Sequence, residues 1–556
     1  MRYIHTLLAV LLLSSATYAQ RGNWHKLSFE KDGVFGANIK HAHALASEMT
    51  PARDPVTVAL IGGGIDVSHP AIRQSIWVNI YQNQNDWTND SRYGWNFLGN
   101  DTTTINGFTS RMGDREFLRL RDKYNRYLFV QGDVAFTFDT ETNELVQIAP
   151  PADREEFEYF QFVVTQSELG QTYRGITIGK ATVAHINRID REMRELFSDR
   201  EELTRQDFSE FNNLTRIEGN QMQKVLNFMS DMMFVSIVGD SWDDLVEFAN
   251  TQLIPFREEQ HRRAMNRLFP RERAIIGDNP YDINQRNYGN HNLFTNNALR
   301  STMMAGIIGG GGDSDRIQGI SQNVRIMTLR IESDSGDPHL KDMALAIRYA
   351  IDHGADIIQL GTTGQLFPRE QGQWVNDALR EAEERGILVV IPMMDRSMNV
   401  DYFPFFPNRN IEDGTLSNVI TVAASDSLGN PFLWANFSET ELDLFAPGVG
   451  IESAMPRNRY ATDNGSHYAA TVVTGVAALL KNYFPDITPA EIRQLLIDTV
   501  TDRGDAEVEK QYRVGSGERR GQIVRDLFLF SDLSLSNGIL NAGRAFEEAK
   551  RRLAPL

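Results

Sequence analysis

The chain has 556 residues, of which 41% are hydrophobic and 23% charged, so it can bury a large core and form more than one folding unit. The formal net charge of −18 argues against a nucleic acid or an anionic membrane as a partner, because both require a basic surface. The sequence contains no cysteine, which excludes disulfides, a thiol nucleophile, a thiolate metal site and a lipoprotein anchor.

Residues 1–19 have the pattern of a secretory signal peptide. Arg2 and His5 precede the apolar run Leu7–Leu13, and Ala19 ends a stretch of small residues. The apolar run is too short to span a bilayer comfortably, and no later stretch is long enough. We therefore expect cleavage after Ala19 and export of the chain as a periplasmic, envelope-associated or secreted protein.

Residues 20–100 are assigned to the first part of a main domain. Its first strand is predicted at Val56–Ile61, which is rich in β-branched residues, and Gly62 begins the turn that follows. A strand followed by glycines also begins a dinucleotide-binding fingerprint. We set that alternative aside because Val67 stands at the third glycine and Pro70 interrupts the helix that should follow.

Residues 101–278 are predicted to form an inserted α-rich subdomain. Phe129–Ile148 alternates enough to indicate strands or a hairpin. Helical periodicity follows in Ala181–Phe211, Gln221–Met233 and Trp242–Phe269, and charged residues cover the remaining faces of these segments.

Residues 279–556 are predicted to complete the main domain. Near the end, Thr488, Pro489 and Glu491 have the spacing of an N-cap, a first-turn proline and a capping-box partner. Strands and helices alternate before this point, which indicates a mainly parallel sheet covered by helices on both faces. The predicted strands are Val324–Ile331, Ile357–Leu360, Leu388–Ile391 and Val419–Ala423, and the predicted helices are Leu340–Ile351 and Trp374–Arg385.

Asn464–Leu480 is predicted to be a helix that is buried on all sides. Ala469, Val472 and Val476 recur on one helical face, and the other faces are small or apolar as well. The helix follows a tight turn at Gly465, so its free N–H groups favour negative charge at this end.

Several segments resemble the motifs of the subtilases, the subtilisin-like serine peptidases. Residues 465–475, GSHYAATVVTG, are similar to the nucleophile-helix pattern G-T-S-x-A-x-P-x-V-A-G. Residues 59–70, ALIGGGIDVSHP, are similar to the segment around the catalytic aspartate, and residues 298–310, ALRSTMMAGIIGG, to that around the catalytic histidine. The resemblance implies an α/β, subtilisin-like three-layer fold that carries the insertion. It also implies that structural calcium is compatible with the chain, since the family often binds it.

The resemblance places other residue types at the reacting positions. Gly62 stands at the catalytic aspartate, Arg300 at the histidine and His467 at the nucleophilic serine. Asp395 stands at the asparagine that stabilises the oxyanion. Four residues near these positions are candidates for lining the former substrate cleft: Gln359, Leu360, Gly361 and Ser466. Two further residues match family positions that are not catalytic, Asp66 and His69.

These residue types do not reproduce serine-peptidase chemistry. Arginine stays protonated and cannot act as the base, and the carboxylate of Asp395 would repel a developing oxyanion. Ser466 is adjacent to His467, but one helical step turns a side chain by about 100°, away from the nucleophile's direction. No metal ligands or other cofactor are predicted, because the chain has no HExxH motif and the His41–His43 pair is interpreted as incidental.

The sequence therefore predicts a pseudopeptidase. It would be an exported protein that binds a peptide or protein partner in the former cleft or on the insertion. The alternatives are an active secreted subtilisin-like serine endopeptidase with a rearranged site, and a structural component of the cell envelope. The resemblance also predicts that Arg300 and Asp395 pair across the site, with His467 beside them.

Overall fold

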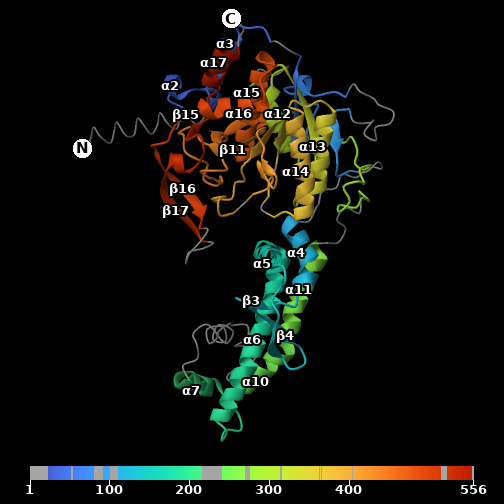
Figure 1. Ribbon diagram of the computed structural model, residues 1–556, viewed down its shortest axis with the longest axis vertical. Coiled ribbons are helices and arrows are strands. Elements are labelled where there is room, and N and C mark those ends of the chain that lie inside the picture. The colour runs from blue at the N-terminus through green and yellow to red at the C-terminus, as the bar shows by residue number, and fades with distance from the viewer. Residues whose placement is uncertain are drawn as a thin grey trace, which may run out of the picture. The chain divides into compact units, whose positions relative to one another are not determined.

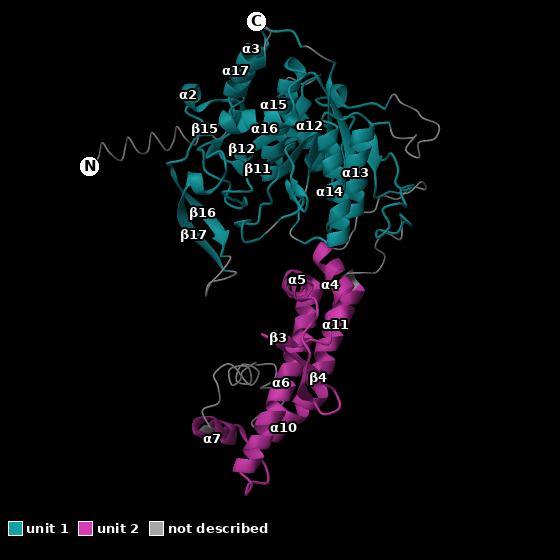
Figure 2. Ribbon diagram, viewed as in Figure 1, with its two compact units in different colours: residues 1–109, 273–556 teal, residues 110–272 magenta. Residues whose placement is uncertain are grey.

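The computed structural model describes residues 23–51, 54–79, 92–99, 111–215, 241–268, 276–312, 316–361, 363–364, 366–403, 405–514 and 522–553. The predicted signal peptide and the predicted helix Gln221–Met233 lie outside these residues. The chain divides into two compact units (Figure 2): unit 1, Met1–Thr109 with Arg273–Leu556, and unit 2, Ser110–Glu272. The insertion was predicted at 101–278, so unit 2 lies within the predicted boundaries.

A mainly parallel sheet forms the centre of unit 1 (Figure 1). All its neighbouring strands pair in parallel except the terminal β15, which runs antiparallel to β18. The prediction of a mainly parallel sheet is thus confirmed. Within the described residues the sheet has nine strands in the order β15 (Thr501–Asp502), β18 (Gly538–Ile539), β12 (Leu444–Pro447), β11 (Val419–Ser425), β8 (Leu388–Pro392), β7 (Ile357–Leu360), β1 (Val56–Gly62), β6 (Val324–Arg330) and β2 (Gly94–Asn96).

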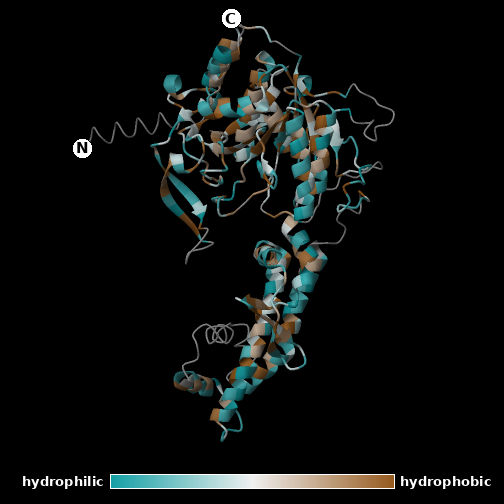
Figure 3. Cartoon of the chain, in the orientation of Figure 1, coloured by the Kyte–Doolittle hydropathy of each residue, from teal (hydrophilic) through white to brown (hydrophobic). Residues whose placement is uncertain are grey.

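Helices cover both faces of this sheet. Side chains alternate across a strand, so Val56, Val58 and Leu60 of β1 share one face, where they join a core with α12 (Leu299–Gly309) and α15 (Ser466–Tyr483). Two further helices, α13 (Leu340–Asp352) and α14 (Arg369–Glu384), contact the sheet but contribute no residue to that core. They therefore lie on the opposite face, and the predicted three-layer arrangement is confirmed. Hydrophobic residues concentrate in these central layers (Figure 3).

Helix α15 is buried on nearly every side, as predicted from its composition. It begins after Gly465, whose φ of +148° is rarely adopted by residues with a side chain. A Cβ atom at Gly465 would also lie 2.5 Å from Cε1 of His467. Glycine at this position therefore allows the tight entry that fixes the first turn of the helix.

Helix α16 (Pro489–Asp498) begins at the predicted capping box. Thr488 accepts a hydrogen bond from the backbone N–H of Glu491, and the Glu491 side chain accepts one from the backbone N–H of Thr488. The remaining elements of unit 1 surround the sheet: η1 (Trp24–Lys26), α2 (Phe29–Asp32), α3 (Ile39–Ala46), η2 (Arg73–Ser75), η4 (Phe530–Asp532), α17 (Ala542–Leu553) and the hairpins β9–β10 (Asn410–Ile411, Gly414–Thr415), β13–β14 (Ile451–Met455, Arg459–Asp463) and β16–β17 (Glu507–Arg513, Ile523–Leu529).

Unit 2 is built from helices and a small antiparallel sheet. The predicted strand segment Phe129–Ile148 contains three described strands, β3 (Phe129–Gln131), β4 (Val134–Asp139) and β5 (Glu144–Ile148). The predicted helix Ala181–Phe211 is wrong in its bounds, because Ser167 caps an earlier start and two helices replace it. The helices are α4 (Met112–Tyr124), α5 (Arg154–Gln166), α6 (Glu168–Leu196), α7 (Arg205–Thr215), α10 (Trp242–Phe248), the π-helical turn η3 (Ala249–Leu253) and α11 (Ile254–Leu268).

Across the described residues of both units, no helix is both long enough and apolar enough to cross a bilayer.

Candidate functional site

The residues selected from the sequence meet at the carboxyl edge of the central sheet. Strands β8, β7, β1 and β6 are consecutive neighbours and run parallel, so their carboxyl ends lie at one edge. Gly62 ends β1, Gly361 follows β7, and Asp395 follows β8. Arg300 lies in the first turn of α12 and His467 in the first turn of α15.

Arg300 forms an ion pair with Glu332, which lies just beyond the carboxyl end of β6. Nη1 of Arg300 is 3.1 Å from Oε2 of Glu332. A Cβ atom on Gly62 would lie 3.7 Å from Oε1 of the same carboxylate, so Glu332 stands directly beside the position where a side chain on Gly62 would begin. The backbone holds this arrangement, because the carbonyl of Gly62 accepts hydrogen bonds from the N–H groups of Ile331 and Glu332.

Burial raises the pKa of Glu332, against the opposing charges of Arg300 and Arg330. Among the described residues, no group forms a hydrogen bond with its buried Oε1 atom. The Glu332 side chain is 14% exposed and that of Arg300 is 43% exposed, so the pair spans the boundary between the interior and the solvent.

Asp395 binds the start of helix α15. Its Oδ1 accepts a hydrogen bond from the Ser466 hydroxyl at 2.6 Å, and its Oδ2 accepts one from the Ser466 backbone N–H at 2.9 Å. The carboxylate therefore occupies the positive end of the helix, where an anion is stabilised. Burial raises the pKa of Asp395, while the Ser466 hydrogen bonds and the charges of Lys510 and Arg300 oppose that rise.

The predicted ion pair between Arg300 and Asp395 is therefore wrong in its partners. Arg300 pairs with Glu332, and both carboxylate oxygens of Asp395 bind Ser466. The physical reason is that each charged group finds a partner on a neighbouring element at hydrogen-bond distance. Arg300 still acts on the rest of the site through its charge, which opposes the rise in the pKa of Asp395 and adds to the lowering of the pKa of His467.

Ser466 is fully buried, and its hydroxyl has two partners. It donates to Asp395 and accepts a hydrogen bond from the backbone N–H of Ala424 at 3.1 Å. Neither partner is an imidazole. The hydroxyl is thus held between a carboxylate and a strand of the sheet.

His467 is neutral and is held through its backbone. Burial first, and then the charge of Arg300, lower its pKa well below the usual range. Its Nε2 atom is buried and has no hydrogen-bond partner in the part of the chain that the structure describes. Its carbonyl accepts hydrogen bonds from Nε2 of Gln359 at 3.1 Å and from the hydroxyl of Thr471 at 2.7 Å.

The four candidates for lining a cleft all lie in the interior. Gln359, Leu360 and Ser466 have no exposed surface, and Gly361 is buried. Gln359 ties β7 to helix α15 through its side-chain amide. The prediction that these residues line the former cleft is therefore corrected. The Gln359 and Ser466 side chains instead join strands of the sheet to helix α15, while Leu360 and Gly361 are buried in the sheet layer.

Two residues of this region were not predicted from the sequence, Glu332 and Lys510. Glu332 follows directly on the predicted strand Val324–Ile331, and the rule that parallel strands end at one edge would have placed it near Gly62. Lys510 of β16 is fully buried, and burial lowers its pKa to about 7, against the effect of Asp395. Nothing in the local sequence of Lys510 indicates this burial.

Asp66 and His69 have structural partners of their own. Oδ2 of Asp66 accepts a hydrogen bond from the backbone N–H of Arg457 at 2.8 Å, and Nε2 of His69 lies 3.0 Å from the carbonyl of Arg459. Within the described ranges, no three His, Asp or Glu side chains gather in a group that could hold a metal ion. The expectation of structural calcium stays a prediction.

The Arg300–Glu332 pair should contribute modestly to stability. A double-mutant cycle of Arg300→Gln and Glu332→Gln is expected to give a coupling energy of about 0.5–1 kcal/mol, since the guanidinium is partly solvated. Chemical unfolding of the four proteins measures this quantity. Arg316→Gln with Glu452→Gln is the matched control, because that pair also joins an exposed arginine to a less exposed glutamate. A coupling of zero would show that Arg300 and Glu332 do not interact in solution.

Comparisons of the sequence with known proteins point to one family. A family model described as the subtilase family matches residues 53–515. The chain is 29% identical over 206 residues to alkaline elastase YaB of Bacillus sp. (strain YaB), covering 37% of this chain and 50% of that protein. It is 28% identical over 211 residues to subtilisin DY of Bacillus licheniformis, covering 37% and 71%. The chain thus spans half the length of the first of these relatives.

Among solved structures, the chain is similar to the prenylagaramide maturation protease PagA. The identity is 22% and the TM-score is 0.36, with 45% of this chain and 82% of that chain covered.

Proposed function

The chain belongs to the subtilase family, and from this premise we propose that it is an exported, non-catalytic member that binds a peptide or protein partner without cleaving it. The family match and the parallel three-layer sheet agree with the subtilisin-like fold class expected from the sequence. Export rests on the signal-like residues 1–19.

One observation carries the proposal of inactivity. The Ser466 hydroxyl is fully buried, and its partners are the Asp395 carboxylate and a backbone N–H. A serine peptidase needs a nucleophilic hydroxyl within hydrogen-bond reach of an imidazole base, and a carboxylate that orients this base. At the positions that resemble the family triad, the described residues instead offer Gly62, Arg300 and His467.

The electrostatics of the site support the same proposal. The negatively charged Asp395 carboxylate accepts a backbone N–H at the positive end of α15. This helix end is therefore not free to stabilise an oxyanion. Arg300 cannot accept a proton at physiological pH. Its carboxylate partner, Glu332, would instead keep the guanidinium in place as a charged group near the surface.

The partner is proposed to be an extended peptide segment. Subtilases hold substrates as an added β-strand, which is a mode of recognition that needs backbone pairing and no catalytic groups. The Arg300 side chain is 43% exposed, so a partner in the former cleft would meet it.

The inactivity is tested with the purified mature chain. We expect no cleavage of casein and no labelling by a fluorophosphonate probe, with subtilisin DY as the positive control. Labelling or cleavage that persists after Ser466→Ala would point to a contaminating peptidase. Labelling or cleavage that Ser466→Ala removes would overturn the proposal.

Partner binding is tested separately. Proteins retained by the immobilised chain from an envelope extract of the source cells are compared with those retained by Arg300→Glu, and by Arg385→Glu as a control on an exposed helix end. We expect the Arg300 variant to lose its specific partner and the Arg385 variant to keep it. Identical retention by both variants would place the partner elsewhere on the chain.

The second candidate is an active secreted endopeptidase with a rearranged site. The observation that favours it is the 2.6 Å hydrogen bond from the Ser466 hydroxyl to Asp395, since a carboxylate can act as a proton acceptor. The complete burial of Ser466 argues against it. The labelling experiment with Ser466→Ala separates the two functions.

A further inference from the structure

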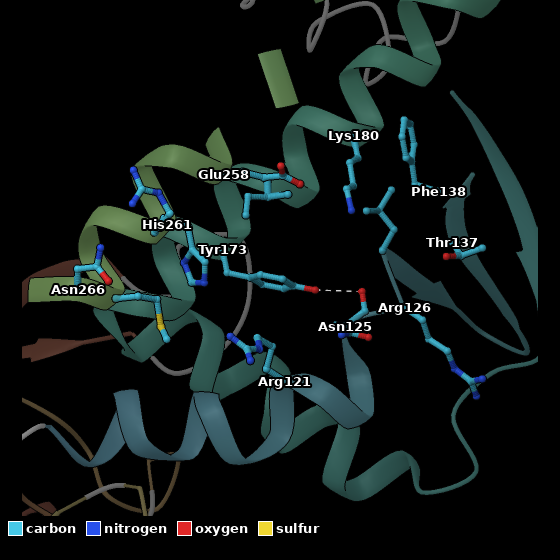
Figure 4. Close-up of a pocket in the computed structure, with 14 residues that line it drawn as sticks. Arg121, Asn125, Arg126, Thr137, Phe138, Tyr173, Lys180, Glu258, His261 and Asn266 are labelled. Atoms are coloured by element: carbon cyan, nitrogen blue, oxygen red, sulfur yellow. Dashed lines mark hydrogen bonds between the residues drawn. The ribbon is translucent and has the colours of Figure 1, made fainter. Parts of the chain in front are cut away.

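Unit 2 contains a pocket that is independent of the sheet edge in unit 1 (Figure 4). Its volume is about 730 Å³. Residues of α4, the following loop, β4, α6 and α11 converge on it, so distant parts of the unit build one concave surface. The volume is that of a typical small-molecule site.

Positive charge is concentrated in this pocket. Arg121, Arg126, Lys180 and Arg262 line it, and Glu258 is the acidic residue among its lining side chains. The unit as a whole has the opposite balance, with 21 Lys and Arg against 29 Asp and Glu in residues 110–272. The cations of the pocket therefore do not follow from the general composition of the unit.

Two of these cations lack a strong internal partner. Lys180 makes no ion pair or hydrogen bond with the residues that the structure describes, and its Nζ lies 5.9 Å from the ring centre of Phe138. Arg121 pairs with the adjacent Asp122, whose side chain is 77% exposed and therefore strongly screened. Arg262, in contrast, forms a double hydrogen bond with Glu259. Arg126 donates a hydrogen bond to the Tyr127 hydroxyl at 2.6 Å, and its guanidinium carbon lies 4.8 Å from the centre of that ring. Arg121 and Lys180 are thus the cations that we assign to a ligand.

The floor of the pocket is held rigidly. The Tyr173 hydroxyl donates a hydrogen bond to the carbonyl of Asn125 at 3.0 Å, and its ring packs 5.3 Å from Phe117 and 6.0 Å from His261. Burial raises the pKa of Tyr173 to about 12, and burial with the charge of Arg121 lowers the pKa of His261, so both side chains are neutral. Figure 4 shows Lys180 and Arg121 on opposite sides of Tyr173.

Apolar side chains complete the wall. Leu128, Phe138, Ile176 and Met265 line the same cavity as the cations. Flat or aliphatic groups gain free energy on leaving water against such a surface, while guanidinium and ammonium groups favour a carboxylate or phosphate. A ligand that contacts both the apolar side chains and the cations must carry an anionic group on an apolar body.

We propose that the pocket in unit 2 binds a small organic anion, with its carboxylate or phosphate between Arg121 and Lys180 and its apolar body against Phe138, Ile176 and Met265. This site is separate from the proposed peptide-binding region, so the failure of either proposal leaves the other standing.

The test is calorimetric titration of the full mature chain with naphthalene-2-carboxylate. We expect saturable binding with one site per chain. Naphthalene-2-methanol has the same apolar body without the charge, and inorganic phosphate has the charge without the body. Both are expected to bind at least about tenfold more weakly, since a charge-assisted hydrogen bond or a buried ring each accounts for that much.

The variants Arg121→Gln and Lys180→Gln locate the anion. Each is expected to weaken naphthalene-2-carboxylate binding about tenfold. Arg174→Gln is the matched control, because Arg174 is exposed on the same helix as Lys180 and does not line the pocket. Unchanged far-ultraviolet circular dichroism shows that the variants are folded. Equal affinity for the neutral alcohol, or full affinity in both pocket variants, would overturn the proposal.

Discussion

Asp395→Ala is expected to lower the free energy of unfolding of unit 1 by about 3 kcal/mol. The Asp395 carboxylate accepts both the N–H and the hydroxyl of Ser466, and Ser466 has no exposed surface. Removing the carboxylate leaves two buried donors without an acceptor and takes a negative charge from the start of α15. Release of the buried carboxylate itself offsets a part of this loss, as its raised pKa indicates.

Guanidinium unfolding followed by tryptophan fluorescence measures the effect, since six of the seven tryptophans lie in unit 1. Two further variants give losses of unfolding free energy with which that of Asp395→Ala is compared. Asp395→Asn keeps one acceptor oxygen and is expected to cost less than the alanine variant. Thr488→Ala removes the exposed cap of α16 and is expected to cost about 1 kcal/mol. A loss no greater than that of Thr488→Ala would contradict the role assigned to Asp395.

The stability of unit 1 is expected to rise with pH above neutrality because of Lys510. This side chain has no exposed surface, and its Nζ donates hydrogen bonds to the carbonyls of Phe432 and Leu433 at 3.1 and 2.8 Å. Burial lowers its pKa to about 7, while the carboxylate of Asp395 acts in the opposite direction. A lysine in the unfolded chain has a pKa of about 10.4.

Between these two pKa values the unfolded state binds more protons than the folded state, so the free energy of unfolding increases with pH. Below pH 7 both states carry the proton and this contribution is constant. From pH 7 to pH 9 the increase due to Lys510 is expected to be about 2 kcal/mol.

Comparison with Lys510→Met isolates this contribution, because the variant carries no titrating group at position 510. The variant leaves the carbonyls of Phe432 and Leu433 without their donor and should be less stable at every pH. The difference in unfolding free energy between the native protein and the variant should widen from pH 7 to pH 9. A constant difference over this range would show that Lys510 keeps its ordinary pKa in the folded protein.

Much of the fold follows from short stretches of sequence. The β-branched run from Val56 gives a strand that begins at the predicted residue, and the capping pattern at Thr488 gives the observed start of α16. The small and apolar residues after Gly465 form the predicted buried helix. Strand pleating, helix capping and helical periodicity each depend on residues a few positions apart, so a single sequence reveals them.

The sequence did not predict correctly which residues of the site pair with one another. Arg300 was expected to pair with Asp395, but Glu332 takes this place, and Ser466 takes both oxygens of Asp395. The burial of Lys510 also left no local sign, since it depends on contacts with Phe432 and Leu433 on a distant segment. Each of these contacts joins residues that lie 32 or more positions apart in the sequence.

The amino-acid sequence alone predicted a parallel α/β core with an insertion. It also identified the residue types that lie at the carboxyl edge of the sheet. Which of those residues contact one another is determined only by the tertiary structure. The strand order β8–β7–β1–β6 does not follow the order of the sequence, so it brings the residues that follow these four strands to one edge of the sheet. Within that edge, hydrogen-bond distance selects the partners, because a buried charge or donor is stable only beside a group that satisfies it.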